Sequence, residues 1–204
     1  MIKNLLFDLG GVIMDIRREN CEKAFRALGM SDIGEFLGDY GQKGPFAALE
    51  AGQIGEKEFR DEVRLHIPGQ VTDEDIDCAL NAFLTGIPRP RLEKLRELRR
   101  KYRIYMLSNT NSIMWDRDIV KAFKQEGLTV NDYFDGIVTS YEAGCCKPDP
   151  RIFRIVTERF GIAPEETIFL DDSQSNIEAA SRLGFGTLHV PSGTEYYNLI
   201  EQTL

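Results

Sequence analysis

Two neighbouring carboxylates, Asp171 and Asp172, follow directly on the apolar run Ile-Phe-Leu. Adjacent carboxylates repel each other unless a cation or hydrogen-bond donors compensate their charge. A third carboxylate, Asp8, follows another apolar run and leads straight into a glycine pair. Asp8 and Asp172 offer the hard oxygen ligands that Mg²⁺ prefers, and a carboxylate can also act as a nucleophile towards a phosphoryl group. These residue types therefore predict phosphoryl chemistry that depends on Mg²⁺.

Two further segments carry groups that suit a phosphoryl ligand. Ser108 and Asn109 can donate hydrogen bonds to it, and Lys147 supplies positive charge where negative charge builds up during transfer. Each feature taken alone also has a plain structural explanation. Asp8 suits the cap of a turn, Ser108 suits the start of a helix, and Lys147 suits a solvated surface. The combination of all of them favours a functional site.

Short β-rich apolar runs recur along the chain, and each of the last four follows a helix-like stretch. Such alternation predicts a parallel sheet built from βα units, and near-continuous apolarity suits strands that are covered on both faces. Open parallel sheets bind ligands outside the carboxyl ends of their strands, where the polar residues described above would lie. We therefore predict an α/β fold with a doubly wound, Rossmann-like parallel sheet, whose strands are Ile2–Phe7, Ile104–Leu107, Gly136–Thr139, Thr167–Leu170 and Thr187–Val190.

The interval of about 70 residues between the first two strands is too long for one crossover helix, and it reads almost wholly helical. Helices are expected at Glu19–Leu28 and Glu56–Leu65, and Ser31 and Thr72 are each followed by acids in the manner of a helix N-cap. A pair of prolines then opens a basic helix that runs through Arg100. The predicted organisation is a core of residues 1–15 and 87–204 with an inserted helical subdomain of residues 16–86.

The 204 residues carry 33 acidic and 25 basic side chains, which gives a net charge of −8. An acidic surface repels nucleic acid and anionic lipid, so neither is expected as a partner. The charge does not exclude an anionic substrate, because a metal ion and one lysine can reverse the sign locally. No apolar run approaches the length of a membrane-spanning helix, so no membrane association is expected.

The four cysteines show neither a zinc-binding spacing nor a disulfide framework, and the adjacent Cys145 and Cys146 are poorly placed to bridge one another. Asp8 interrupts the apolar N-terminus, and no cleavage site typical of a signal peptide follows it. We therefore expect reduced thiols and a cytoplasmic protein. The two histidines, His66 and His189, have no partner that the sequence identifies.

Four segments together resemble the motifs of the haloacid dehalogenase-like (HAD) superfamily, and the likeness covers essentially the whole chain. Phe-Asp-Leu-Gly-Gly-Val around Asp8 resembles the first motif, Ser-Asn-Thr from Ser108 the second, Lys-Pro-Asp-Pro from Lys147 the third, and Leu-Asp-Asp-Ser-x-x-Asn ending at Asn176 the fourth. The helical insertion resembles the small helical cap of that superfamily, the C1 type. The Asp-Leu-Gly form of the first motif is most similar to the branch that includes bacterial α-D-glucose-1-phosphate phosphatases.

This resemblance implies a Mg²⁺-dependent phosphatase that acts on a small phosphorylated metabolite such as a sugar phosphate. By the likeness, Asp8 is the nucleophile and forms an aspartyl-phosphate. The metal ligands would be Asp8, the backbone carbonyl of Gly10 and Asp172. Asp171 would order water molecules bound to the metal.

The same likeness assigns the phosphate to Ser108 and Asn109 together with the loop Gly10–Gly11. Lys147 would bridge the nucleophile and the phosphate. Asn176 would orient that lysine or the acidic pair. Substrate identity would depend on side chains of the cap, and no residue pattern there indicates a particular substrate. The sequence does not indicate the oligomeric state either.

One departure from the family pattern concerns the general acid. Most phosphatases of this superfamily carry a second Asp two positions after the nucleophile, which protonates the leaving group and then activates water, but here that position is Gly10. Such catalysis contributes about 10² to 10⁴-fold, so the chain is a slow enzyme, uses a good leaving group or has a replacement acid. Asp15 and the acids of the cap are the candidates for replacement. A positive φ at Gly10 would make an Asp there unfavourable.

Three other functions share some of these residues. A phosphosugar mutase needs the same nucleophile and also an acid–base group, so Gly10 counts against it. A dehalogenase displaces halide from carbon without Mg²⁺, which leaves the acidic pair without an evident task. A catalytically weak phospho-ligand-binding protein is compatible with Gly10, but the presence of Asp8, Lys147 and Asp172 together argues against it. A phosphatase is therefore the expected function.

Overall fold

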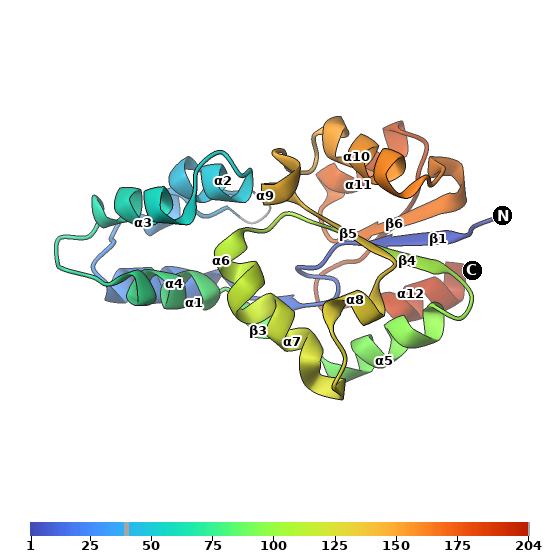
Figure 1. The fold of residues 1–204 in the computed structure, drawn as a ribbon, viewed down its shortest axis with the longest axis horizontal. Helices are drawn as coiled ribbons and strands as arrows, with labels where there is room; N and C mark the ends of the chain where they lie inside the picture. Colours follow the sequence, from blue (N-terminus) through green and yellow to red (C-terminus); the bar gives the residue numbers. More distant parts are fainter. Residues whose placement is uncertain (39–40, 204) are drawn as a thin grey trace.

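A parallel β-sheet forms the centre of the molecule. The computed structural model describes residues 1–38 and 41–203. All neighbouring strands of the sheet are parallel, in the order β5-β4-β1-β6-β7 (Figure 1). The predicted α/β fold is therefore confirmed. The strands lie where the apolar runs placed them, with small shifts at their ends: β1 (Asn4–Phe7), β4 (Arg103–Ser108), β5 (Gly136–Thr139), β6 (Thr167–Asp171) and β7 (Gly186–His189).

Alternate residues of the central strands enter two separate cores, because successive side chains of a strand point to opposite faces. Leu5 and Phe7 of β1 belong to one core, and Leu6 between them belongs to the other. Helices cover both faces of the sheet, as in a doubly wound fold. The first face is covered by α5 (Arg89–Leu98), α8 (Val130–Tyr133) and α12 (Tyr196–Thr203), and the second by α10 (Pro150–Phe160) and α11 (Gln174–Arg182) (Figure 1).

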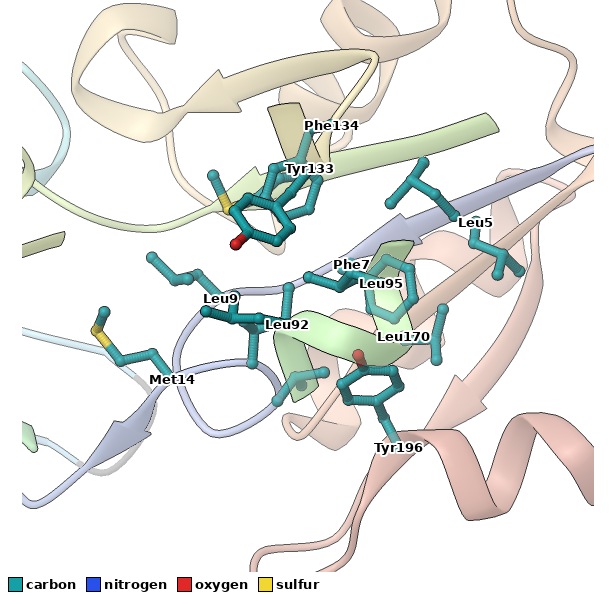
Figure 2. Packing of buried hydrophobic residues seen from close by; sticks show 14 of the residues in the cluster. Leu5, Phe7, Leu9, Met14, Leu92, Leu95, Tyr133, Phe134, Leu170 and Tyr196 are labelled. Carbon is teal, nitrogen blue, oxygen red and sulfur yellow. The ribbon is translucent and has the colours of Figure 1, made fainter. Parts of the chain in front are cut away.

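Aromatic and leucine side chains fill the first core (Figure 2). Phe7 packs edge-on against Tyr196, with 5.1 Å between the ring centroids. The Tyr196 hydroxyl donates a hydrogen bond of 2.6 Å to the backbone oxygen of Arg91 in α5. These contacts fasten the last helix of the chain to both β1 and α5.

Four helices between β1 and β4 form a separate unit with its own apolar core. The unit extends from one end of the sheet, away from the two chain termini (Figure 1). A short antiparallel pair, β2 (Asp15–Ile16) with β3 (Leu84–Gly86), holds its entry and exit side by side. The division of the chain at residues 16 and 86 stays a prediction. The helices of the unit are α1 (Arg18–Ala27), α2 (Gly44–Glu50), α3 (Glu56–Arg64) and α4 (Asp73–Asn81).

Local signals placed most helix ends within two residues. Thr72 begins α4 as predicted, through a capping box in which its hydroxyl accepts the N–H of Asp75 and the Asp75 carboxylate accepts that of Thr72. The expectation at Ser31 was wrong, because a 3₁₀ helix begins two residues later at Ile33. The basic helix α5 ends at Leu98, two residues before the predicted end.

Short elements complete the connections. They are 3₁₀ helices at Ile33–Glu35, Phe123–Glu126 and Pro164–Glu166, α6 (Ser112–Met114), a π-helical turn at Trp115–Ile119, α7 (Val120–Ala122) and α9 (Ser140–Ala143). Within residues 1–38 and 41–203, no helix has the length and apolarity required to cross a membrane.

Arg91 joins three parts of the core. Its side chain is only 6% exposed and lies 2.8 Å from both Asp15 of β2 and Glu195 before α12. It also donates a hydrogen bond of 3.2 Å to the backbone oxygen of Ile13. The guanidinium therefore pairs with two carboxylates and donates a hydrogen bond to a buried carbonyl at the point where the helical unit leaves the core.

We predict that Arg91→Ala lowers the free energy of unfolding by about 2 to 4 kcal/mol, because it leaves charged and polar partners unpaired in a buried place. Urea unfolding followed by circular dichroism measures the loss. Arg89→Ala is the control, since Arg89 pairs with Glu93 in solvent, and such a pair contributes less than about 1 kcal/mol. Similar losses in the two variants would contradict the assignment.

Candidate active site

The residues singled out by the sequence gather at the carboxyl ends of three adjacent strands. Asp8 follows β1, Ser108 ends β4, and Asp171 ends β6. The chain proceeds from β1 to β4 and β5 on one side and to β6 and β7 on the other, so β1 is the point where the strand order reverses. Open α/β sheets bind ligands at such a point.

Lys147 lies between two carboxylates at this edge. Its Nζ is 2.7 Å from Asp8 Oδ1 and 2.7 Å from Asp171 Oδ2, and its side chain is almost fully buried. Burial opposes the charged form of the lysine, but attraction to Asp171 and Asp8 outweighs burial and raises its pKa. Lys147 is therefore a fixed positive charge in the site.

Asp171 is fully engaged by donors. Besides Lys147, it accepts hydrogen bonds from the Asn176 side-chain amide at 3.0 and 3.2 Å and from the backbone N–H of Ser173 at 2.8 Å. The structure thus places Asp171 as the partner of Lys147, and its predicted role in ordering water bound to the metal stays a prediction. Asn176 bonds to Asp171 and thus acts on Lys147 through that carboxylate. This contact agrees with the expectation that Asn176 orients the lysine or the acidic pair.

Asp8 and Asp172 keep oxygens that face the open site. Asp8 Oδ1 accepts the Leu9 N–H at 2.6 Å and the lysine, which leaves Oδ2 without a recorded partner in the part of the chain described. Among the described residues, the donor to the Asp172 carboxylate is its own backbone N–H. Burial, opposed by Lys147, raises the pKa of Asp8, and burial with repulsion from Asp171 raises that of Asp172 to about 6.

The charges at this edge fit a divalent cation. Oxygens of Asp8, Asp171 and Asp172 lie within 4.8 Å of one another, and Lys147 is the cation that bonds to this cluster. Three carboxylates against one ammonium leave two negative charges uncompensated in a buried place, which is unfavourable without a further cation. The free oxygens of Asp8 and Asp172 are hard ligands of the kind that Mg²⁺ selects.

The loop after Asp8 passes very close to Asp172. Gly11 has a φ of +75°, and a Cβ built on it would lie 2.3 Å from Asp172 Oδ2. Gly10 has no positive φ, and a Cβ there would meet only Ile16 at 3.5 Å. The backbone constraint expected at Gly10 therefore belongs to Gly11.

The side chain of Asn109 contacts Lys147, and the predicted contact of Asn109 with the phosphate stays a prediction. Its side-chain amide donates 3.0 Å to the backbone oxygen of Lys147 and accepts 2.8 Å from the backbone N–H of the same residue. Both ends of the amide thus hold the backbone of Lys147. The buried Ser108 hydroxyl lines the cavity and lies 3.4 Å from the backbone oxygen of Asn109. Such a long bond leaves the hydroxyl able to turn to a phosphate.

A cleft between the sheet edge and the helical unit contains all of these groups. It encloses about 960 Å³ of space, counted to its open mouth. Apolar side chains of the helical unit, such as Leu37, Phe46 and Leu80, line its far side. Of the described lining residues between 16 and 86, one has a carboxylate, and it is Glu50 at the end of α2. The cleft is thus polar at the sheet edge and mostly apolar opposite.

Glu50 was not singled out by the sequence, although a signal exists. It is the last residue of α2, where the helix dipole disfavours a negative charge. Burial raises its pKa to about 7, against the opposing effect of Lys147. An acid at such a place violates a local preference, and violations of this kind gather at functional sites. Asp15, the other candidate acid, pairs with Arg91 and does not line the cleft.

Both histidines have partners that the sequence did not reveal. His66 Nδ1 lies 2.7 Å from Asp32 Oδ2 within the helical unit. His189 Nε2 lies 2.8 Å from the backbone oxygen of Asp172 and thus supports the acidic cluster from outside.

Comparison with known families agrees with this site. The model of the haloacid dehalogenase-like hydrolases matches residues 2–184. The chain belongs to this family. The resemblance inferred from the four motifs is therefore confirmed, whereas the C1 type of the cap and the likeness to the glucose-1-phosphate branch stay predictions.

Several members of the haloacid dehalogenase-like family are similar over their whole length. The chain is 37% identical over 196 residues to D-ribitol-5-phosphate phosphatase of Bacteroides thetaiotaomicron, which covers 96% of this chain and 95% of that protein. A wild-type HAD family enzyme from the same species, crystallised with magnesium and inorganic phosphate, has a TM-score of 0.91 and 43% identity, with coverage of 98% and 99%. A HAD-like hydrolase from Porphyromonas gingivalis has a TM-score of 0.92 and 36% identity, with coverage of 100% and 98%.

The contact between Gly11 and Asp172 predicts that Gly11→Ala destabilises the protein by about 2 kcal/mol or more, because an L-residue is strained at this φ and its Cβ collides with the carboxylate. Gly10→Ala is the matched control and should change the thermal midpoint far less, since its Cβ has room. Differential scanning fluorimetry of both variants tests the prediction. Equal midpoints would show that the loop adapts freely.

The raised pKa of Glu50 predicts a pH dependence of stability. The folded state holds this proton more tightly than the unfolded chain, so the contribution is complete below the ordinary pKa of 4.5 and is lost as the pH rises to about 7. Relative to Glu50→Gln, the wild type should lose about 1 to 3 kcal/mol of unfolding free energy across this window. Urea unfolding at pH 4.5 and pH 8 measures the difference. A constant difference between the two proteins would contradict the shifted pKa.

Proposed function

We propose that this chain is a Mg²⁺-dependent phosphatase of a small phosphorylated polyol or sugar, which forms an aspartyl-phosphate on Asp8. The observation that carries the proposal is the state of Asp8. Its Oδ1 is held by Lys147 and by the Leu9 N–H, so its Oδ2 has a defined direction and remains available for attack on phosphorus. The alignment of a fixed nucleophile with its target supplies much of the rate in phosphoryl transfer.

The metal site of the proposal consists of Asp8, the backbone carbonyl of Gly10 and Asp172. Both carboxylates belong to a cluster with excess negative charge, and the similar enzyme from Bacteroides thetaiotaomicron was crystallised with magnesium and inorganic phosphate. When bound, Mg²⁺ would neutralise charge on the transferred phosphoryl group. This agrees with the metal expected from the sequence.

The chain's own residues account for the remaining needs of the reaction. Lys147 supplies a positive charge within reach of the nucleophile, and its backbone is held by Asn109. The Ser108 hydroxyl is the donor for a phosphate oxygen. Asp171 and Asn176 keep the lysine in place, so they act as positioning residues.

The shape of the cleft supports a small substrate whose phosphate lies at the sheet edge. The carbon chain would then extend towards α2 and α4, where Gln42 and Glu50 are the described polar side chains with oxygen groups opposite the sheet. The 37% identity to a D-ribitol-5-phosphate phosphatase agrees with a phosphorylated alditol or sugar.

For the covalent step, we predict that Asp8→Asn lowers kcat by on the order of 10³-fold or more, since the amide keeps the shape but loses the anionic nucleophile. Release of inorganic phosphate from D-ribitol 5-phosphate and p-nitrophenyl phosphate measures the loss. The exposed Asp116→Asn is the matched control and should retain wild-type turnover. Substantial turnover in the Asp8 variant would refute a nucleophilic role.

For the metal, we predict that Asp172→Asn weakens Mg²⁺ binding by about tenfold or more, because one of two carboxylate ligands loses its charge. The Mg²⁺-dependent rise of the thermal midpoint gives a readout that is independent of turnover. In the wild type, binding should weaken as the pH falls through about 6, where Asp172 becomes protonated. An unchanged Mg²⁺ response in the variant would disprove the ligand assignment.

A further inference from the structure

Cleavage of an alkyl phosphate requires a proton for the departing oxygen. Among the described residues, the carboxylates beside the nucleophile loop are Asp172, which the proposal assigns to the metal, and Asp171, which pairs with Lys147. Gly10 occupies the usual position of the acid, although the backbone there has room for a side chain. Asp15 is engaged by Arg91, outside the cleft. A group on the opposite wall of the cleft must therefore be considered.

We propose that Glu50 is the general acid and base of the reaction, supplied by the helical unit in place of the family's residue on the core. The inference rests on the proposed function. Glu50 belongs to the helical unit and lines the same cleft as Asp8, Ser108 and Lys147. A leaving group in this cleft would lie in the space that Glu50 also lines.

The end of α2 is fastened to the catalytic core, which gives Glu50 a defined place. The Ser140 hydroxyl accepts the Thr110 N–H at 2.9 Å, and its single proton lies between the backbone oxygens of Glu50 at 2.6 Å and of Thr110 at 2.9 Å from Oγ. Thr110 belongs to the loop that carries the Ser108 hydroxyl. Gly52 also contacts the core closely, because a Cβ there would lie 2.1 Å from the backbone oxygen of Tyr141. The Ser140 hydroxyl therefore holds both the backbone of Glu50 and the loop that follows Ser108.

The surroundings of Glu50 suit proton transfer near neutral pH. The charged and titratable groups that act on it or share its cleft are Lys147, the thiol of Cys146, and across the cleft Asp8 and Asp172. Burial raises the pKa of Glu50 to about 7, which lies in the range where one group can both donate and accept a proton efficiently.

The reaction balances with Glu50 in this role. As Asp8 Oδ2 forms its bond to phosphorus, the bond from phosphorus to the ester oxygen breaks, and the Glu50 proton moves to that oxygen, so the product leaves as a neutral alcohol. The Glu50 carboxylate then takes a proton from water as the water oxygen attacks phosphorus. The bond from Asp8 to phosphorus breaks, and inorganic phosphate, the Asp8 carboxylate and protonated Glu50 are restored.

Glu50→Gln tests the inference, because the amide keeps size and polarity but cannot donate a carboxyl proton. kcat/KM is measured with Mg²⁺ on phosphate esters whose leaving groups range from p-nitrophenol to alcohols, including D-ribitol 5-phosphate. We expect a loss of about 10² to 10⁴-fold for alkyl esters and less than about threefold for p-nitrophenyl phosphate, whose leaving group needs no proton. Rates should therefore depend more steeply on leaving-group pKa in the variant. Glu58→Gln, an exposed acid of α3, is the matched control and should behave as the wild type.

The pH profile provides a second readout that a merely structural role would not change. With alkyl esters, kcat/KM of the wild type should fall as the pH rises above about 7, because Glu50 loses the proton that it must donate. This alkaline limb should be absent with p-nitrophenyl phosphate and absent in Glu50→Gln. Ionisation of the phosphate ester itself is common to both substrate types, so comparison between them removes it.

Equal losses on alkyl and aryl esters in Glu50→Gln, or no loss on either, would overturn the role of Glu50. A rise of tenfold or more in alkyl ester cleavage by Gly10→Asp would also overturn the proposal, because it would show that the wild type has no general acid. A smaller change agrees with the proposal. These outcomes differ from failure of the proposed function, which would appear as undiminished turnover in Asp8→Asn.

Discussion

The site depends on one buried ammonium held between two carboxylates. Lys147 lies 2.7 Å from both Asp8 and Asp171, and this arrangement fixes the nucleophile, orients the lysine and leaves the second oxygen of Asp8 free. A buried pair of this kind contributes little to stability by itself, because desolvation offsets the attraction. Its value lies in geometry, and much of the surrounding structure maintains it. Asn109 holds the lysine backbone, Asn176 and the Ser173 N–H hold Asp171, and the Gly11 loop passes the cluster at a distance that no side chain allows.

The remaining charge connects this geometry to function. Three acids and one lysine leave the site with a net negative charge. A divalent cation would offset that charge and allow an anionic substrate to bind. The net charge of −8 is therefore no obstacle to a phosphorylated substrate, because the sign that the substrate meets is set locally. A dehalogenase would have no evident use for the free Asp172 carboxylate, so the geometry favours phosphoryl transfer over that chemistry.

The helical unit does more than cover the cleft. Its apolar face excludes water from a charged site, which strengthens the electrostatic interactions inside. Through α2 it also places a carboxyl group opposite the nucleophile, and the Ser140 hydroxyl ties that helix to the loop beside the phosphate. A chain with glycine at position 10 thus has a carboxyl group of suitable pKa on the helical unit, within the same cleft as the nucleophile.

The sequence by itself determined the fold class, the five strands and the identity of the acidic cluster, because apolar periodicity and residue order at strand ends are local properties of the chain. Only the tertiary structure decided what each side chain touches. The sequence did not reveal that the Asn109 amide holds the backbone of Lys147, nor that Asp171 is bonded to Lys147 and Asn176. The position that requires glycine is Gly11 and not Gly10. Any other residue at position 11 would be strained by the positive φ and would collide with Asp172, which lies more than 150 residues away along the sequence. The sequence offered the acids of the cap only as a group, and the tertiary structure singled out Glu50, because a carboxyl group becomes an acid of neutral pKa through burial and neighbours that distant segments supply.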